Sequence, residues 1–194
     1  MQNLLVEYNV IEYGKELLSE AADMSKPLVL KNVLLQQAIK ENQNGRRYPQ
    51  EVLQREALKY KENFVSQRRA LGELDHPESP VVNLKNVCCN VTDLWFDGPR
   101  VVGNIEILST PAGNIVRELV KNNIRLGVSS RGLGSVRPIG EGKVEVQDDF
   151  SLICFDIVSN PSTFGAFINE NKHNKVTPYT KIDSLIHEFL SEVK

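Results

Sequence analysis

The sequence is poor in cysteine and histidine, lacks a long apolar run and has no excess of charge of either sign. Its three cysteines, Cys88, Cys89 and Cys154, form no CxxC pattern, which excludes a disulfide scaffold and a cysteine zinc site. The 23 lysines and arginines nearly balance the 25 aspartates and glutamates, so no global field draws the chain to nucleic acid or an anionic membrane. No apolar run approaches the ~18 residues of a membrane helix. Because acidic residues interrupt the N-terminal leucines, unlike in a signal peptide, we expect a soluble cytoplasmic protein.

The chain has the size and composition of one globular domain, or of one domain with a tail. It has 194 residues, of which 41% are apolar and 25% charged. Hydrophobic spacing predicts strands over 28–39, 143–146 and 150–158, a β-hairpin within 80–107, and helices over 50–65 and 114–122. We expect an N-terminal segment (1–27), a main domain (28–167), and a polar linker with a final amphipathic helix (168–194) that forms a candidate pro-segment.

His76 is the histidine with the most distinctive surroundings. It lies in the sequence GELDHP (72–77), where Pro77 keeps the preceding residue out of helical geometry and favours an extended loop with a projecting imidazole. The simplest interpretation is a loop histidine beside acidic residues. A metal site formed with Glu73 and Asp75 is disfavoured, since no second histidine lies nearby and an HExxH motif is absent.

A second unusual stretch, LGVSSRGLGS, spans residues 126–135. Its glycines would let a backbone approach a substrate closely and aim amides at one point, as an oxyanion hole or a phosphate cradle requires. The stretch is neither a P-loop nor a GxSxG elbow. Taken alone, it predicts a strand followed by a flexible turn.

Three short motifs in this order resemble one known family. They are NxNxRxYP (Asn42, Asn44, Arg46, Tyr48, Pro49), GELDHP and GVSSRGLGS, and together they resemble the prohead core protease family of T-even type tailed bacteriophages over residues 28–165. That family consists of serine endopeptidases distantly similar to herpesvirus assemblins. The resemblance implies an α+β fold with a herpesvirus-protease-like β-barrel core, surrounding helices and a C-terminal amphipathic helix.

The resemblance also assigns catalytic roles. It implies His76 as the base and Ser129 as the nucleophile, because an alcohol attacks only when a positioned imidazole takes its proton. Ser130 is the alternative nucleophile, and the two hydroxyls should face opposite sides of a strand. Asp156, an acid among apolar residues, is the candidate that orients the imidazole. The amides around Ser130 and Arg131 are candidates for the oxyanion hole, and the loop 160–163 remains open as another.

The family cleaves after glutamate in Leu/Ile-x-Glu sequences, and its members process themselves. A glutamate that enters a pocket needs a cationic partner, for which Arg46 and Arg131 are the candidates. Short Leu/Ile-x-Glu sequences near the start and in the tail of this chain give five candidate self-cleavage sites: Glu170, Glu188, Glu192, Glu7 and Glu20. Of these, Glu170 is favoured because it opens the polar linker.

The resemblance implies an enzyme that uses neither a cofactor nor a metal. Its substrates would be the scaffold, core and major capsid proteins of a phage, inside the assembling prohead in the host cytoplasm. We expect no membrane partner and no specific nucleic acid, although residues 46–69 are locally basic, and a homo-oligomer is left open. The alternative is a catalytically silent prohead core or scaffold-binding protein with the same fold, which the joint presence of His76, Ser129 and Asp156 disfavours.

Overall fold

The computed structural model describes residues 2–42, 44–77, 79–140 and 142–159. Its helical elements are α1 (Lys15–Ala22), α2 (Gln50–Tyr60), the π-helical turn η1 (Lys61–Val65) and α3 (Pro111–Lys121). Its strands are β1 (Asn3–Val10), β2 (Leu28–Gln37), β3 (Arg46–Arg47), β4 (Leu71–Glu73), β5 (Val87–Asp97), β6 (Arg100–Ile107), β7 (Gly127–Gly134), β8 (Val136–Gly140), β9 (Lys143–Val146) and β10 (Ser151–Val158).

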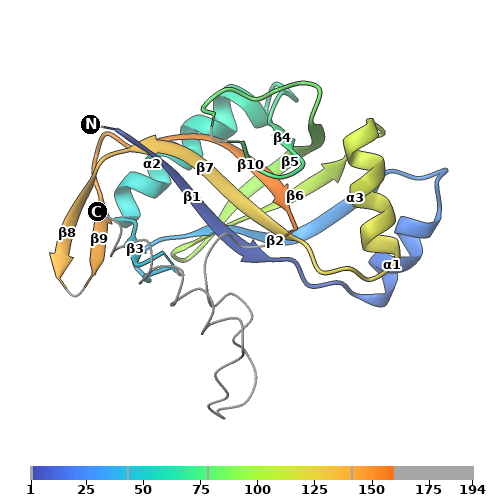
Figure 1. Cartoon of the computed structure of the whole chain (residues 1–194), viewed down its shortest axis with the longest axis horizontal. Helices are drawn as coiled ribbons and strands as arrows, with labels where there is room; N and C mark the ends of the chain where they lie inside the picture. The colour runs from blue at the N-terminus through green and yellow to red at the C-terminus, as the bar shows by residue number, and fades with distance from the viewer. Residues whose placement is uncertain (1, 43, 78, 141, 160–194) are drawn as a thin grey trace, which may run out of the picture.

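The strands form three sheets. One has the order β1-β7-β10, the second β2-β6-β5-β4, and a small third sheet consists of β3-β9-β8. Figure 1 shows β1, β7 and β10 running side by side across the molecule, with the β8–β9 hairpin extending from one end. The prediction of a mixed α+β fold is confirmed.

The closed barrel expected from the resemblance is not seen among the described strands. At one edge, an isolated bridge between Leu74 and Ile157 joins the end of β4 to β10. At the other edge, the Asn9 side-chain amide donates to the Leu35 carbonyl at 3.1 Å, between β1 and β2. The two larger sheets therefore approach each other at both edges without forming one continuous ladder.

Local sequence signals explain the hairpin and the helices. β5 and β6 pair with Asp97 opposite Arg100, and Gly98 supplies the positive φ of +58° that a tight turn needs. The helix expected over 50–65 is observed as α2 continued by η1. The helix expected over 114–122 begins earlier, at Pro111, because Thr110 Oγ1 accepts a hydrogen bond from the Gly113 amide at 3.0 Å.

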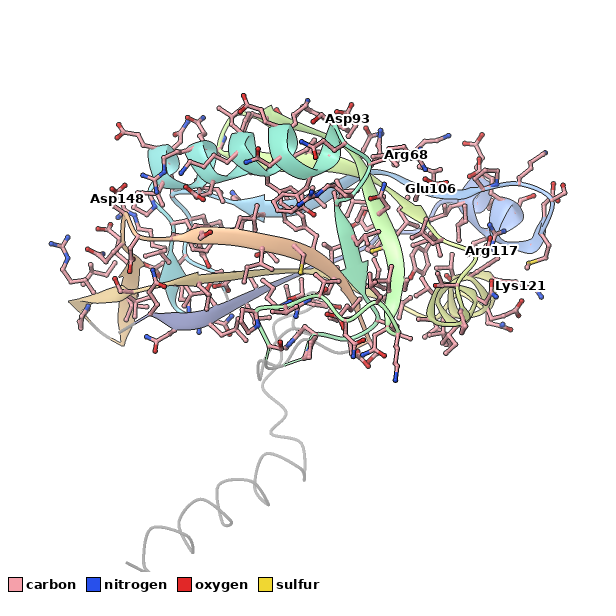
Figure 2. The ribbon with its side chains drawn as sticks, turned by 90° about the horizontal axis from the view of Figure 1, so that it is seen from above. Arg68, Asp93, Glu106, Arg117, Lys121 and Asp148 are labelled. Carbon is pink, nitrogen blue, oxygen red and sulfur yellow. The ribbon has the colours of Figure 1, made fainter. Side chains whose placement is uncertain are left out.

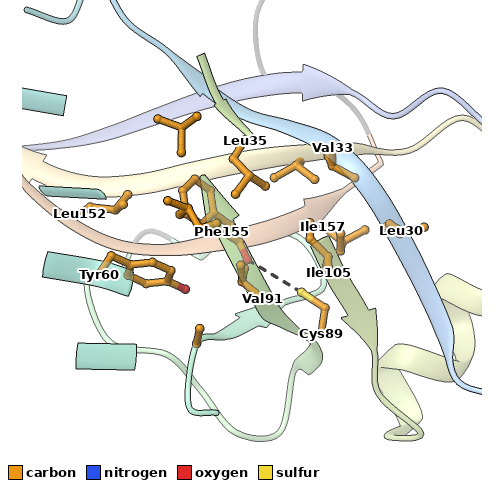
Figure 3. Packing of buried hydrophobic residues seen from close by; sticks show 14 of the residues in the cluster. Leu30, Val33, Leu35, Tyr60, Cys89, Val91, Ile105, Leu152, Phe155 and Ile157 are labelled. Atoms are coloured by element: carbon orange, nitrogen blue, oxygen red, sulfur yellow. Dashed lines mark hydrogen bonds between the residues drawn. The ribbon is translucent and has the colours of Figure 1, made fainter. Parts of the chain in front are cut away.

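The core lies between the two larger sheets. Figure 3 shows Leu35, Val91 and Ile105 from one sheet facing Leu152, Phe155 and Ile157 from the other. Tyr60 at the end of α2 packs edge-on against Phe155, with the ring centroids 5.4 Å apart. All three cysteines are buried and unpaired, as expected, and the Cys89 thiol donates to the Phe155 carbonyl at 3.9 Å.

Residues 3–22, which the sequence analysis set apart as an N-terminal segment, are integrated in the fold through β1 and α1. β1 pairs with β7 along its whole length, from Asn3 opposite Gly134 to Val10 opposite Gly127. The side chain of Arg117 in α3 anchors the chain that follows α1, donating to the carbonyls of Asp23 and Lys26 at 3.1 and 2.8 Å (Figure 2). The predicted linker and C-terminal helix lie outside the described residues. No described helix is long and apolar enough to span a membrane.

Candidate active site

The two adjacent serines of β7 face opposite sides of the sheet. Ser130 lies opposite Glu7 and Phe155 on the side that faces the core, and its hydroxyl accepts a hydrogen bond from the Gln36 amide at 2.9 Å. Ser129 lies opposite Tyr8 and Asp156 on the other side. The predicted opposition of the two hydroxyls is therefore confirmed.

The Ser129 hydroxyl is buried and uncommitted. The residue is 1% exposed, and its Oγ has no hydrogen-bond partner within the described part of the chain. A buried hydroxyl without a partner is energetically unfavourable, so its retention calls for an explanation. One such explanation is that the hydroxyl is a nucleophile, which forms a hydrogen bond to its general base only when substrate is present.

His76 follows the end of β4, beside β10. The Asp75 amide donates to the Ile157 carbonyl at 2.7 Å, and the Asp75 backbone takes a left-handed φ of +55°, which turns the chain. The Asp75 carboxylate accepts hydrogen bonds from the Ser159 amide and hydroxyl, both at 3.3 Å. These contacts hold the partly exposed His76 next to β10, the strand that carries Asp156 and neighbours the Ser129 strand.

A buried ion cluster surrounds Arg131, which lies two residues after Ser129 on the same side of β7. Its guanidinium donates to Glu73 Oε1 at 2.9 Å and to the Ser79 carbonyl at 2.6 Å. It also lies 3.0 Å from Asp156 Oδ2 and donates to the Cys154 sulfur at 3.2 Å. Ser79 lies three residues beyond His76, so the chain around His76 (74–77 and 79, the His76 segment) is tied to a side chain on the Ser129 side of β7.

The Asp156 carboxylate is completely buried inside this cluster. Its Oδ1 accepts hydrogen bonds from the Glu73 amide at 2.9 Å and from Arg131 at 3.1 Å. Burial raises the pKa of Asp156, while the Glu73 amide and the Arg131 guanidinium oppose that shift. Asp156 has no hydrogen bond to His76 within the described residues, so its role in orienting the imidazole stays a prediction.

The first motif, NxNxRxYP, builds a second buried polar cluster around Glu7. Arg46 Nη1 and the Tyr48 hydroxyl donate to Glu7 Oε1 at 3.0 and 2.8 Å, and Asn44 Nδ2 donates to Oε2 at 2.7 Å. Burial raises the pKa of Glu7, and Arg46 opposes that shift. Sequence reasoning missed this role of Glu7, because its partners Arg46 and Tyr48 lie some forty residues further along the chain.

Several predicted site residues have internal partners. Arg131 is 0% exposed and bound to the internal acids Glu73 and Asp156, so in this structure its guanidinium is not available to a substrate carboxylate. Arg46 already binds an internal carboxylate, that of Glu7. Glu7, a candidate self-cleavage site, is 2% exposed within the paired strand β1, so its backbone is not free to enter a protease groove in this structure.

The remaining self-cleavage candidates differ in what the structure shows of them. Glu20 lies within α1, where a helical backbone cannot enter a protease groove without unwinding. Glu170, Glu188 and Glu192 lie outside the described residues, as does the loop 160–163.

The glycine-rich turn predicted after the serines is a strand. Gly132 and Gly134 belong to β7, which is paired on both sides, so the amides of Ser130 and Arg131 lie within a ladder rather than in a loop. The reason for glycine is packing, since a Cβ on Gly132 would lie 2.5 Å from the ring of Phe150. No group of three or more potential metal ligands was found among the described residues.

Comparisons with known proteins show the family and the fold of the chain. A family model described as "Prohead core protein serine protease" matches residues 3–177. The prohead core protein protease of Enterobacteria phage T4 is 32% identical over 148 residues, which cover 74% of this chain and 69% of the T4 protein. The solved structure of the bacteriophage T4 capsid assembly protease superposes with a TM-score of 0.70 at 24% identity, covering 82% of this chain and 99% of that one. The chain belongs to the prohead core protein serine protease family.

Proposed function

We propose that this protein is a serine endopeptidase that matures phage proheads, with Ser129 as its nucleophile and His76 as its general base. The observation that carries the assignment is the contrast between the two adjacent serines. Ser130 faces the core and is bonded to Gln36, whereas the Ser129 hydroxyl is uncommitted on the side of β7 from which Arg131 binds the His76 segment. Family membership supports the reaction class.

The chemistry follows from these two side chains. Ser129 Oγ attacks the scissile carbonyl carbon while the imidazole of His76 takes the hydroxyl proton. When the carbon–nitrogen bond of the tetrahedral intermediate breaks, His76 gives that proton to the leaving amine. Water then hydrolyses the acyl-enzyme by the same proton transfers. In this proposal Asp156 stabilises the charged form of the imidazole. It does so from β10, the strand that lies between the His76 segment and the Ser129 strand.

The substrates that we propose are the scaffold, core and major capsid proteins of the prohead, cleaved after glutamate in Leu/Ile-x-Glu sequences. The names of the matched T4 sequence, a prohead core protein protease, and of the matched T4 structure, a capsid assembly protease, support a role inside the assembling capsid. The host cytoplasm is then the compartment in which the reaction takes place.

Peptide mapping tests the proposed function. The purified protein is incubated with the capsid and scaffold proteins of its phage, and new termini are identified by mass spectrometry. We expect new C-termini at glutamate with the wild-type protein and none with Ser129→Ala. New termini that persist with Ser129→Ala would refute the assigned nucleophile. The absence of any new terminus would favour a catalytically silent scaffold-binding protein.

We further propose that the enzyme processes itself after Glu170, within the sequence Ile168-Asn169-Glu170. The argument is the polar sequence that follows, which suits an extended substrate, and the apolar spacing of the predicted final helix, which cleavage would release. Intact-mass measurement of active protein should show a product that ends at Glu170. An enzyme that remains full length while it cleaves capsid proteins would contradict self-processing alone.

A further inference from the structure

The guanidinium of Arg131 joins four segments of the chain. Its own strand, β7, carries Ser129, and its donors reach Glu73 on β4, Asp156 on β10 and the carbonyl of Ser79. The side chain is 0% exposed, and so are those of its two acidic partners. The three charged side chains of this cluster are therefore shielded from solvent.

Two of these contacts bracket His76. Glu73 lies three residues before the histidine and Ser79 three residues after it, and both bond to the same guanidinium. Glu73 Oε1 also accepts a hydrogen bond from the Asn83 amide at 3.1 Å, which holds the later part of the segment. Besides the contacts of Asp75 with β10, one side chain two residues from the serine thus holds the chain on both sides of His76.

Stability alone does not account for such a cluster. A buried ion pair contributes little net stability, because the desolvation of the charges offsets their attraction, and apolar residues of similar volume often do as well. What an arginine adds is direction: a planar fork of donors fixes several acceptors at set angles, which a lysine ammonium does not do. What the arginine contributes to the cluster is therefore a fixed geometry of its acceptors.

We propose that Arg131 is a positioning residue, which holds the His76 segment at the distance from Ser129 that proton transfer requires. Asp156 and Glu73 act through it, as the acceptors that fix the orientation of the guanidinium. Arg131 itself touches neither substrate nor the reacting atoms. The proposal rests on the proposed function, and it assigns Arg131 a role different from substrate or oxyanion binding.

Arg131→Lys tests the proposal because it keeps the charge and removes the fork. A displacement of a catalytic group by about 1 Å costs about 100-fold in rate. We expect kcat on a capsid-protein substrate to fall by about that factor, with KM changed less than about threefold. The rate at which a small fluorophosphonate labels Ser129 should fall in parallel, since labelling depends on the base but not on peptide contacts.

Arg117→Lys is the matched control. Arg117 is also buried and also donates to several backbone carbonyls, but these belong to the chain around the end of α1 (Figure 2). We expect Arg117→Lys to lower thermal stability while kcat and the labelling rate stay near the wild-type values. If both variants change kcat equally, or if Arg131→Lys raises KM without lowering kcat, the positioning role is refuted.

Glu73→Ala covers the case in which Arg131→Lys does not fold. Here Arg131 keeps Asp156 as its counter-ion, so no charge is left unpaired, but the earlier of the two contacts that bracket His76 is lost. We expect a folded protein with a reduced kcat and a reduced labelling rate, and wild-type values of both would overturn the inference. If the wild-type protein itself is neither labelled nor active, the proposed function fails first and the inference fails with it.

Discussion

Tyr48→Phe measures what the Glu7 cluster contributes to stability. The substitution removes one hydroxyl, which donates to Glu7 Oε1 at 2.8 Å, and leaves the edge-on ring contact with Phe150 in place. Both side chains are almost fully buried, so the carboxylate loses a partner that water cannot replace. A lost hydrogen bond of this kind costs about 2 kcal/mol. For a domain of this size that lowers Tm by roughly 4–8 °C.

Tyr60→Phe is the chemically identical control with the opposite expectation. Tyr60 is 2% exposed, but its hydroxyl has no hydrogen-bond partner among the described residues, so its removal relieves an uncompensated buried group. We expect the free energy of unfolding to stay the same or to rise by about 1 kcal/mol. Urea unfolding at pH 7 compares the two variants with the wild type. Equal losses in both variants would refute the reasoning, because the loss would then not depend on whether the hydroxyl has a hydrogen-bond partner.

Three further predictions concern packing, charge and catalysis. A Cβ on Gly72 would lie 1.9 Å from the Phe155 carbonyl oxygen, so Gly72→Ala should force β4 away from β10 and lower the free energy of unfolding by about 1–3 kcal/mol or more in urea unfolding. Burial raises the pKa of Glu7 in the folded state above its ordinary value of 4.5. The contribution of Glu7 to the free energy of unfolding is therefore full below pH 4.5 and is lost as the pH rises through the folded-state pKa. The stability difference between wild type and Glu7→Gln should therefore shrink from pH 4 to pH 7, and a difference that grows would show the opposite shift. In single-turnover assays His76→Ala should be as inactive as Ser129→Ala, and the double variant should be little worse, since members of a catalytic unit are not additive.

Elements specified by neighbouring residues could be predicted from the sequence. The turn at Gly98 fixes the β5–β6 hairpin, and the apolar stripe beginning at Val52 fixes α2, since each signal lies within the element that it specifies. β1 could not be recognised, because its buried Glu7 breaks the apolar alternation and its partners are Arg46 and Tyr48, some forty residues away.

The glycine-rich stretch misled the sequence analysis for a related reason. Gly132 lies in a sequence that is typical of a turn. Its neighbour in space is the ring of Phe150, which lies just before β10. The opposite facing of Ser129 and Ser130 was predictable from strand geometry alone. The role of Arg131 was not, because its partners Glu73 and Asp156 come together only in the folded chain.

The measurement that tests the central claim most directly compares Ser129→Ala with Ser130→Ala in one cleavage assay, with folding of both checked by circular dichroism. Ser130→Ala removes the acceptor of the Gln36 amide and should cost some stability while retaining substantial cleavage. Ser129→Ala should fold and cleave nothing, and a fluorophosphonate should label wild type and Ser130→Ala at Ser129. Cleavage by Ser129→Ala together with an inactive, folded Ser130→Ala would contradict the account and place the nucleophile on the core-facing side of β7.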